Sequence, residues 1–156
     1  MPCSFRLATQ TDLDSVLLLM RQMQADDPWS ELFDESSVRH NLLELLHNSS
    51  YGLVYLACAE ESPIGYLVIC FDYSLEYRGK GAWVDELFVQ PSYRGQGIGT
   101  LLLDVAESAS REHRAQFLHL EVSHGNKALE LYRRRGFVDH QRYLMTKPLI
   151  ATEKKI

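Results

Sequence analysis

The chain has 156 residues, of which 46% are hydrophobic and 24% are charged. This length fits one domain, with enough apolar material for a core that needs neither disulfides nor metal ions. The 16 basic and 21 acidic residues give a formal net charge of −5. Such a balance argues against a nucleic acid as the main partner, because phosphate binding requires a basic face.

The cysteines and the N-terminal stretch indicate the compartment. Cys3, Cys58 and Cys70 form no CxxC pair, and the last two lie in apolar runs. A reduced cysteine there behaves as a small hydrophobe, so we expect structural thiols in a cytoplasmic protein. The first residues lack the basic region and apolar run of a signal peptide. No stretch reaches the about 18 apolar residues of a membrane span, so we expect no membrane partner.

The front half of the chain predicts two helices and a hairpin. A short strand is expected over 4–8, followed by a helix that Asp12 can cap. A second helix is expected over 35–47. Two strands over 52–60 and 64–73 are separated by a turn signal, so they are predicted to pair as an antiparallel hairpin.

The back half alternates strands and helices. The expected elements are a strand over 82–89, a glycine-rich turn over 93–99, a helix from Ile98, a strand over 117–122, a helical face over 128–132 closed by Gly136, and one or two final strands over 137–149. Strand, helix and strand in this order predict a βαβ crossover. We therefore expect an α/β or α+β fold, with a mixed, mostly antiparallel sheet, a central βαβ unit and flanking helices. A single domain is expected over 1–149, with a loose tail over 150–156.

A glycine-rich segment joins the strand over 82–89 to the following helix. Its residues are Arg94, Gly95, Gln96, Gly97, Ile98, Gly99 and Thr100. Unpaired N–H groups at a helix start, together with glycines that allow close approach, form an anion site whose usual guest is a pyrophosphate. The spacing departs from the Rossmann GxGxxG and lacks the Walker Gly-Lys-Ser/Thr ending. A glycine turn without a ligand stays open as the plain alternative.

Two longer stretches carry a resemblance. The run Glu-Leu-Phe-Val-Gln-Pro-Ser-Tyr-Arg-Gly-Gln-Gly-Ile-Gly over 86–99 closely resembles motif A of the GNAT superfamily of N-acetyltransferases. Leu-Glu-Val over 120–122 and the run over 128–137 are similar to its motif B, and 143–149 looks like its last strand. The resemblance covers about residues 82–149. It implies that acetyl-coenzyme A is the co-substrate. No metal is expected, because the histidines at 113, 119, 124 and 140 lack the spacing of zinc ligands and no cysteine joins them.

The resemblance also implies how the cofactor is held. Backbone groups of Leu87, Phe88 and Val89 would hold the acetyl and pantetheine part, and a bulge at these residues would open a cleft between two neighbouring parallel strands. The diphosphate would lie on the backbone N–H groups of 94–100, and the Arg94 side chain could add a charged contact. The family commonly has an asparagine seven residues before its tyrosine, whereas here Asn126 lies six residues before Tyr132.

The acid and base candidates follow from the same resemblance. Tyr132 stands where the family usually keeps a tyrosine that protonates the leaving sulfur, and a core aromatic is the alternative. The base candidates are Glu86, Glu121 and Asp85, which could receive a proton through water or attract a cationic amine. For each of them, an exposed face or a salt bridge is the alternative. The weaker candidates for the acceptor pocket are Tyr73, Tyr77 and the pair Asp26-Asp27.

We therefore expect direct transfer of an acetyl group from acetyl-CoA to a primary amine in a ternary complex, with no covalent enzyme intermediate. The acidic residues before the bulge favour a small cationic amine as acceptor. A protein N-terminal acetyltransferase acting on a peptide amine and a non-catalytic acyl-CoA-binding regulatory module are the alternatives. Dimers are common in such families, so a homodimer also stays open.

Overall fold

The computed structural model describes residues 3–26, 34–147 and 149. The expected tail over 150–156 and the candidate Asp27 lie outside these residues. The chain divides into two compact units, Met1–Glu121 and Val122–Ile156. A single domain over 1–149 therefore stays a prediction. Within the described residues, no helix has the length and apolar character that a bilayer crossing requires.

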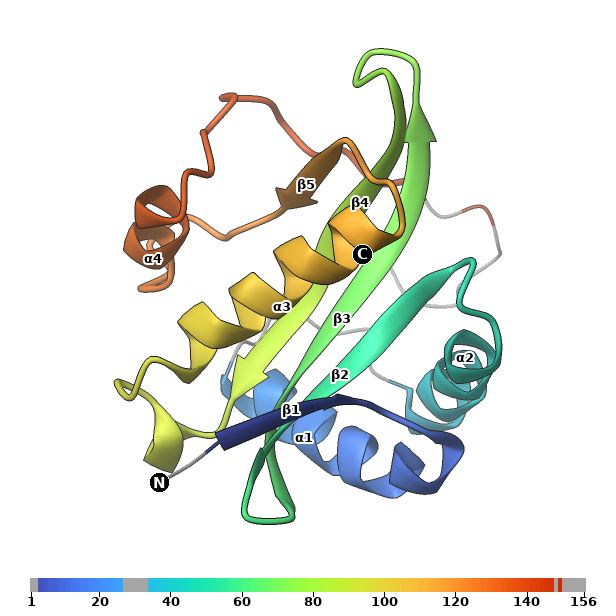
Figure 1. Ribbon diagram of the computed structural model, residues 1–156, viewed down its shortest axis with the longest axis vertical. Coiled ribbons are helices and arrows are strands. Elements are labelled where there is room, and N and C mark those ends of the chain that lie inside the picture. The colour runs from blue at the N-terminus through green and yellow to red at the C-terminus, as the bar shows by residue number, and fades with distance from the viewer. Residues whose placement is uncertain (1–2, 27–33, 148, 150–156) are drawn as a thin grey trace. The chain divides into compact units, whose positions relative to one another are not determined.

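The first unit contains one five-stranded sheet in the order β1-β2-β3-β4-β5 (Figure 1). Its strands are β1 (Cys3–Leu7), β2 (Gly52–Ala59), β3 (Ser62–Ser74), β4 (Gly79–Val89) and β5 (Phe117–Leu120). Neighbours from β1 to β4 pair antiparallel, while β4 and β5 are parallel and are joined through α3 (Ile98–Glu112). The expected mixed sheet with a central βαβ unit is confirmed.

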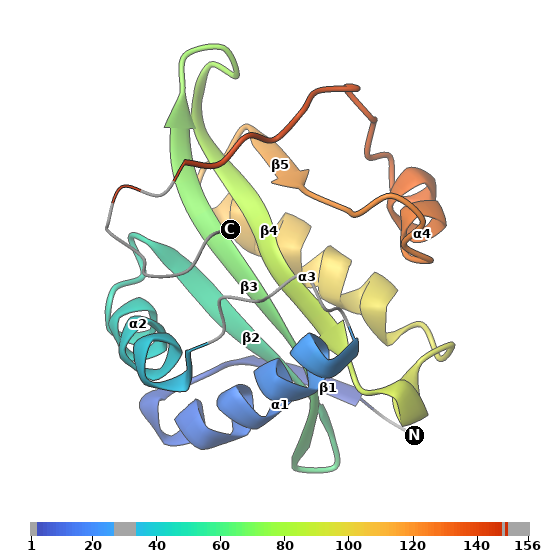
Figure 2. The same ribbon diagram turned by 180° about the vertical axis from the view of Figure 1, so that it is seen from behind.

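Helices cover both faces of this sheet. Figures 1 and 2 show α3 on one face and α1 (Leu13–Asp26) with α2 (Glu35–His47) on the other. The core against α1 and α2 includes Val16, Leu42 and Phe88, each at most 4% exposed. On α3, Leu102 and Leu103 are fully buried. Apolar side chains at helical spacing thus bury the expected flanking helices against the sheet.

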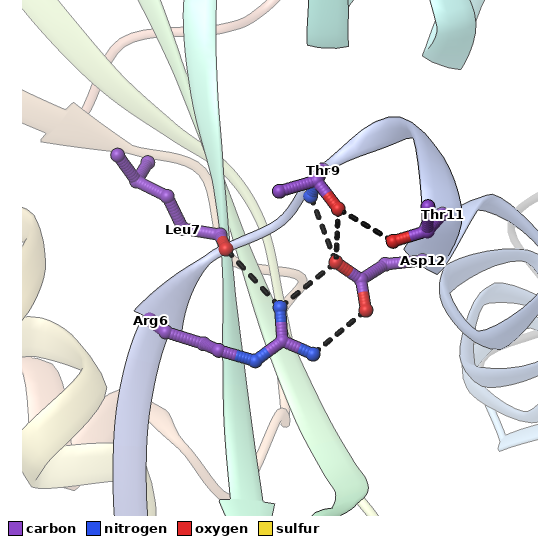
Figure 3. A network of polar contacts seen from close by, with 5 residues as sticks. All are labelled: Arg6, Leu7, Thr9, Thr11 and Asp12. Atoms are coloured by element: carbon purple, nitrogen blue, oxygen red, sulfur yellow. Dashed lines mark hydrogen bonds and ion pairs between the residues drawn. The ribbon is translucent and has the colours of Figure 1, made fainter.

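A polar network fastens β1 to the start of α1 (Figure 3). The Arg6 guanidinium donates two hydrogen bonds to the Asp12 carboxylate, at 2.8 and 2.7 Å. Asp12 closes a short 3-10 helix, Gln10–Asp12, and also accepts a bond of 2.8 Å from the Thr9 backbone N–H. The hydrogen bonds from Arg6 hold the pKa of Asp12 well below its usual range. The N-cap is Thr9, and Asp12, the third residue of the 3-10 helix, accepts from the Thr9 N–H in a capping box. Asp12 therefore takes part in the cap, as expected, but not as the N-cap residue itself.

A bulge in β4 separates it from β5. Val68 of β3 lies opposite Glu86, but Ile69 lies opposite Val84, so Asp85 is the extra residue. The expected bulge therefore exists, but it precedes Leu87 instead of lying among 87–89. Pairing between β4 and β5 ends where Val84 meets Leu120.

The end of that pairing changes the last strand of the first unit. A strand was expected over 117–122, but β5 stops at Leu120 because β4 no longer runs beside it. Glu121 therefore lies beyond the strand, where strand alternation no longer determines the direction of its side chain.

The second unit contains one short helix in its described part, α4 (Leu129–Arg134). Gly136 follows its end with a φ of 87°, as expected of a helix-terminating glycine. The final strands expected over 137–149 are not formed in the described residues. Tyr143 and Met145 are 94% and 89% exposed. A strand requires a neighbour for its backbone groups, and apolar alternation alone does not supply one.

Candidate active site

The glycine loop forms an open main-chain cradle at the start of α3. Gly95 and Gly97 have φ angles of 74° and 82°, which non-glycine residues rarely adopt. A Cβ placed on either would meet no atom of the described residues within 4 Å, so the loop is uncrowded at these two positions. Among the described residues, no side chain caps the helix at Gly97. The first helical bond runs from Leu101 N–H to the Gly97 carbonyl, at 3.1 Å.

The N–H groups at 98–100 therefore precede the first intrahelical bond, and they carry the positive end of the helix dipole. Ile98 itself is buried, whereas Gly95 and Gly97 are exposed. This combination of free donors, positive potential and an uncrowded approach is suited to a phosphate group.

The Arg94 side chain is bonded to groups outside this cradle. Its Nε donates to the Val89 carbonyl at 2.8 Å, and a terminal nitrogen bonds the Asp26 carboxylate at 2.5 Å. Its guanidinium carbon also lies 5.4 Å from the centroid of the Phe88 ring. Asp26, a weaker candidate for the acceptor pocket, thus has a partner in the loop.

After the bulge, no strand in the described part of the chain pairs with one edge of β4, which we call its open edge. The Gln90 N–H donates to the Ile64 carbonyl at 2.9 Å, and Val89 lies opposite Gly65. Antiparallel pairs alternate, so Phe88 directs its backbone groups toward β3, while those of Leu87 and Val89 face the opposite edge. β5 does not pair with that edge beyond Val84. An extended ligand with amide groups could therefore pair there.

Glu86 is held by a buried tyrosine. Tyr66 of β3 is fully buried, and its hydroxyl donates to the Glu86 carboxylate at 2.7 Å. The same hydroxyl lies 3.3 Å from the Met23 sulfur on α1. Burial raises the pKa of Glu86, and the nearby Asp85 charge raises it further, whereas the Tyr66 hydrogen bond lowers it. A carboxylate with a raised pKa is closer to the range in which it can act as a general base.

Asp85 occupies the bulge itself. Its side chain is exposed to solvent, yet the protein around it displaces enough water to raise its pKa. Bulges re-aim side chains beside active sites. Two carboxylates with raised pKa values thus stand side by side in the sequence where β4 leaves β5. Perturbed pairs of this kind mark functional sites more often than chance.

An aromatic cluster lies just before the bulge. The His119 ring packs against Tyr77 at a centroid distance of 4.5 Å and against Trp83 at 4.9 Å. Phe117 lies 4.9 Å from Tyr77 and is 43% exposed. The Trp83 indole N–H donates to Asp72 at 3.0 Å. Of this cluster, sequence reasoning singled out only Tyr77 for the acceptor, because the strand pairing that unites the rings is not visible locally.

In the second unit, Tyr132 lies on α4, where it is half-buried, and burial raises the pKa of its hydroxyl. Its ring meets Phe137 edge-on, at a centroid distance of 6.0 Å. The Asn126 side-chain oxygen accepts a hydrogen bond of 2.8 Å from the Ala128 N–H at the start of α4. That bond makes Asn126 part of the turn that starts α4, and its role toward a cofactor stays a prediction.

The model of the acetyltransferase (GNAT) family matches residues 17–137. The chain belongs to this GNAT family. A thialysine N-epsilon-acetyltransferase from Bos taurus is 32% identical over 145 residues, which are 86% of this chain and 83% of that protein. An aminoalkylphosphonate N-acetyltransferase from Salmonella typhimurium is 29% identical over 136 residues, which are 86% of this chain and 84% of that protein.

The GNAT fold is also evident among solved structures. The crystal structure of a predicted acetyltransferase with acetyl-CoA from Clostridium acetobutylicum has a TM-score of 0.81 at 18% sequence identity. The match covers 94% of this chain and 96% of that one. The resemblance that the two sequence motifs carry is thus confirmed, and with it the general class of an acyltransferase.

Proposed function

We propose that this GNAT protein transfers an acetyl group from acetyl-CoA to the amine of a small cationic acceptor. The observation that carries the proposal is the uncapped start of α3 beside the open edge of β4. One offers backbone donors to a diphosphate, and the other offers backbone groups to the pantetheine amides. Leu87 and Val89 would hold the pantetheine arm, and Gly95 to Thr100 the diphosphate.

The carboxylates at the bulge supply the basic chemistry. The acceptor amine must lose a proton to become a nucleophile, and Glu86 or Asp85 would receive it, directly or through water. Glu86 is the stronger candidate because the Tyr66 hydrogen bond fixes the position of its carboxylate at 2.7 Å. Glu121, beyond the end of β5, is the third candidate. Tyr132 would return a proton to the departing thiolate, and attack would be direct, with no acylated residue.

Charge and aromatic surface together favour a cationic acceptor. Asp85 is an exposed carboxylate. Trp83 lies two residues before it on β4, and Tyr77 lies in the turn between β3 and β4; both rings pack against His119. An ammonium group is attracted both by carboxylates and by aromatic faces. Two relatives are named for thialysine and for aminoalkylphosphonates, and both compounds are small amines.

The test is an acceptor panel with a free-thiol readout of coenzyme A release. It should include thialysine, lysine, polyamines, an aminoalkylphosphonate and a peptide with a free N-terminus. Turnover on a small cationic amine would support the proposal, and turnover on the peptide alone would assign an N-terminal acetyltransferase. Coenzyme A binding with no turnover on any acceptor would instead identify a non-catalytic binding module.

Single variants then assign the base. Glu86→Gln, Asp85→Asn and Glu121→Gln each remove one carboxylate with little change of shape. The variant that lacks the proton acceptor should have a kcat lower by about 100-fold or more, since general base catalysis contributes about that factor. Equal and negligible losses would reject all three carboxylates.

A further inference from the structure

We propose that Asp26 and Gln22 of α1 position the glycine loop over 94–100, the coenzyme A loop. In this proposal Arg94 links that loop to α1 through Asp26, a structural role that we call a strut. In this role Arg94 is not a ligand of the diphosphate. The inference rests on the proposed function, because it concerns how the loop receives coenzyme A.

The end of α1 is fastened to the segment that follows β4 at two points. Asp26 binds Arg94 at 2.5 Å, and the Gln22 side-chain oxygen accepts from the Gln90 amide at 3.0 Å. Gln22 and Asp26 are four residues apart, so they lie on one face of the helix. Gln90 and Arg94 stand at the two ends of the turn Pro91–Tyr93, just before the glycines. Side chains of α1 therefore form hydrogen bonds at both ends of this turn.

The contacts of Arg94 argue against a direct role with phosphate. Its Nε is bonded to the carbonyl of Val89, and its positive charge is offset by Asp26. Its guanidinium also stands over the Phe88 ring, at 5.4 Å. To reach a diphosphate beyond Gly97, the side chain would have to leave the carboxylate. The backbone N–H groups at 98–100 require no such rearrangement.

A strut at this position has a physical use. The two glycines with positive φ make the loop intrinsically mobile when nothing holds it. A loop that is already fixed loses less conformational entropy when the ligand binds, so affinity rises. Arg94 and Asp26 are about half-exposed, at 49% and 43%. A pair that exposed is expected to change affinity only by about threefold to fivefold.

The direction in which Asp26→Asn changes coenzyme A affinity distinguishes the strut role of Arg94 from a role as a diphosphate ligand. We would measure coenzyme A binding to the full chain by calorimetry for wild type, Asp26→Asn, Arg94→Gln and the double variant. If Arg94 is a strut, Asp26→Asn weakens binding by about threefold to fivefold, Arg94→Gln does so similarly, and the double variant is no worse than either. If Arg94 binds the diphosphate, Asp26→Asn frees its charge and tightens binding.

Two controls keep the result specific. Asp14→Asn removes another ion pair of α1, with Arg39 of α2 at 2.6 Å, and should leave coenzyme A affinity unchanged. Binding of pantetheine, which lacks the diphosphate, should be unaffected by Asp26→Asn, whereas general destabilisation would weaken both ligands. Arg94→Lys keeps the positive charge but loses the planar guanidinium that bonds both Val89 and Asp26. If Arg94 is a strut, this variant should therefore not restore coenzyme A affinity.

The outcomes are distinct from those of the proposed function. If wild type binds no coenzyme A, the proposed function itself fails. If wild type binds but Asp26→Asn binds equally well or more tightly, while Arg94→Gln weakens binding, the strut is overturned and Arg94 is a phosphate ligand.

Discussion

The hydrogen bond between Tyr66 and Glu86 makes the identity of the base testable by a pH profile. Tyr66→Phe removes only a hydroxyl from a fully buried ring, so the packing of β3 against α1 is kept. The removed bond is a donor to a carboxylate at 2.7 Å. It favours the ionised form of Glu86, and it lowers the pKa that burial raises.

The size of the effect follows from the charge on the acceptor. A hydrogen bond to a charged group contributes about 1.5–3 kcal/mol, and about 1.4 kcal/mol corresponds to one pKa unit. The pKa of Glu86 should therefore rise in Tyr66→Phe, because the bond that favours its ionised form is lost. Since a base must be deprotonated to act, the acidic limb of the kcat/KM profile should move to higher pH.

The assay is thiol release at subsaturating acceptor, measured across the acidic and neutral range. Tyr51→Phe is a matched control, because Tyr51 is 52% exposed and should leave the profile unchanged. If the acidic limb of Tyr66→Phe coincides with that of wild type while activity persists, Glu86 is not the titrating base. The same result would direct attention to Asp85.

Three further predictions concern stability, the loop and the acid. Asp12→Asn should lower the free energy of unfolding by about 1.5–3 kcal/mol at neutral pH. Because the folded pKa of Asp12 is depressed, this stabilisation is present above the ordinary carboxyl pKa and is lost as pH falls. Urea denaturation should therefore show that the difference in unfolding free energy between wild type and Asp12→Asn becomes smaller at acidic pH. In Gly97→Ala the added Cβ meets no atom of the described residues within 4 Å, but the residue must keep a φ of 82°. The resulting strain of about 1 kcal/mol should weaken coenzyme A binding by about fivefold. In Gly65→Ala the added Cβ would lie 2.6 Å from the Phe88 carbonyl oxygen, so this variant should instead have a lower melting temperature. Tyr132→Phe should lower kcat with little change in the Kd of acetyl-CoA, and an unchanged kcat would remove Tyr132 as the acid.

The sequence by itself determined the central part of the protein. The strand, glycine loop and helix around Gly97 are specified by local properties: a short, largely apolar run over 82–89, closely spaced glycines over 95–99 and apolar spacing at the helical period from Ile98. The same is true of the hairpin of β2 and β3, whose strands are adjacent in the chain. The family resemblance and the expected place of a diphosphate follow from this local pattern.

Contacts between distant residues were decided only by the tertiary structure. The partner of Arg94 is Asp26, 68 residues away, and the partner of Glu86 is Tyr66, 20 residues away. The bulge that makes Asp85 the extra residue depends on how β3 and β4 pair. No periodicity in one segment encodes which side chain from another segment will face it. A polar side chain at such a position gains its role only when packing removes water and supplies a partner.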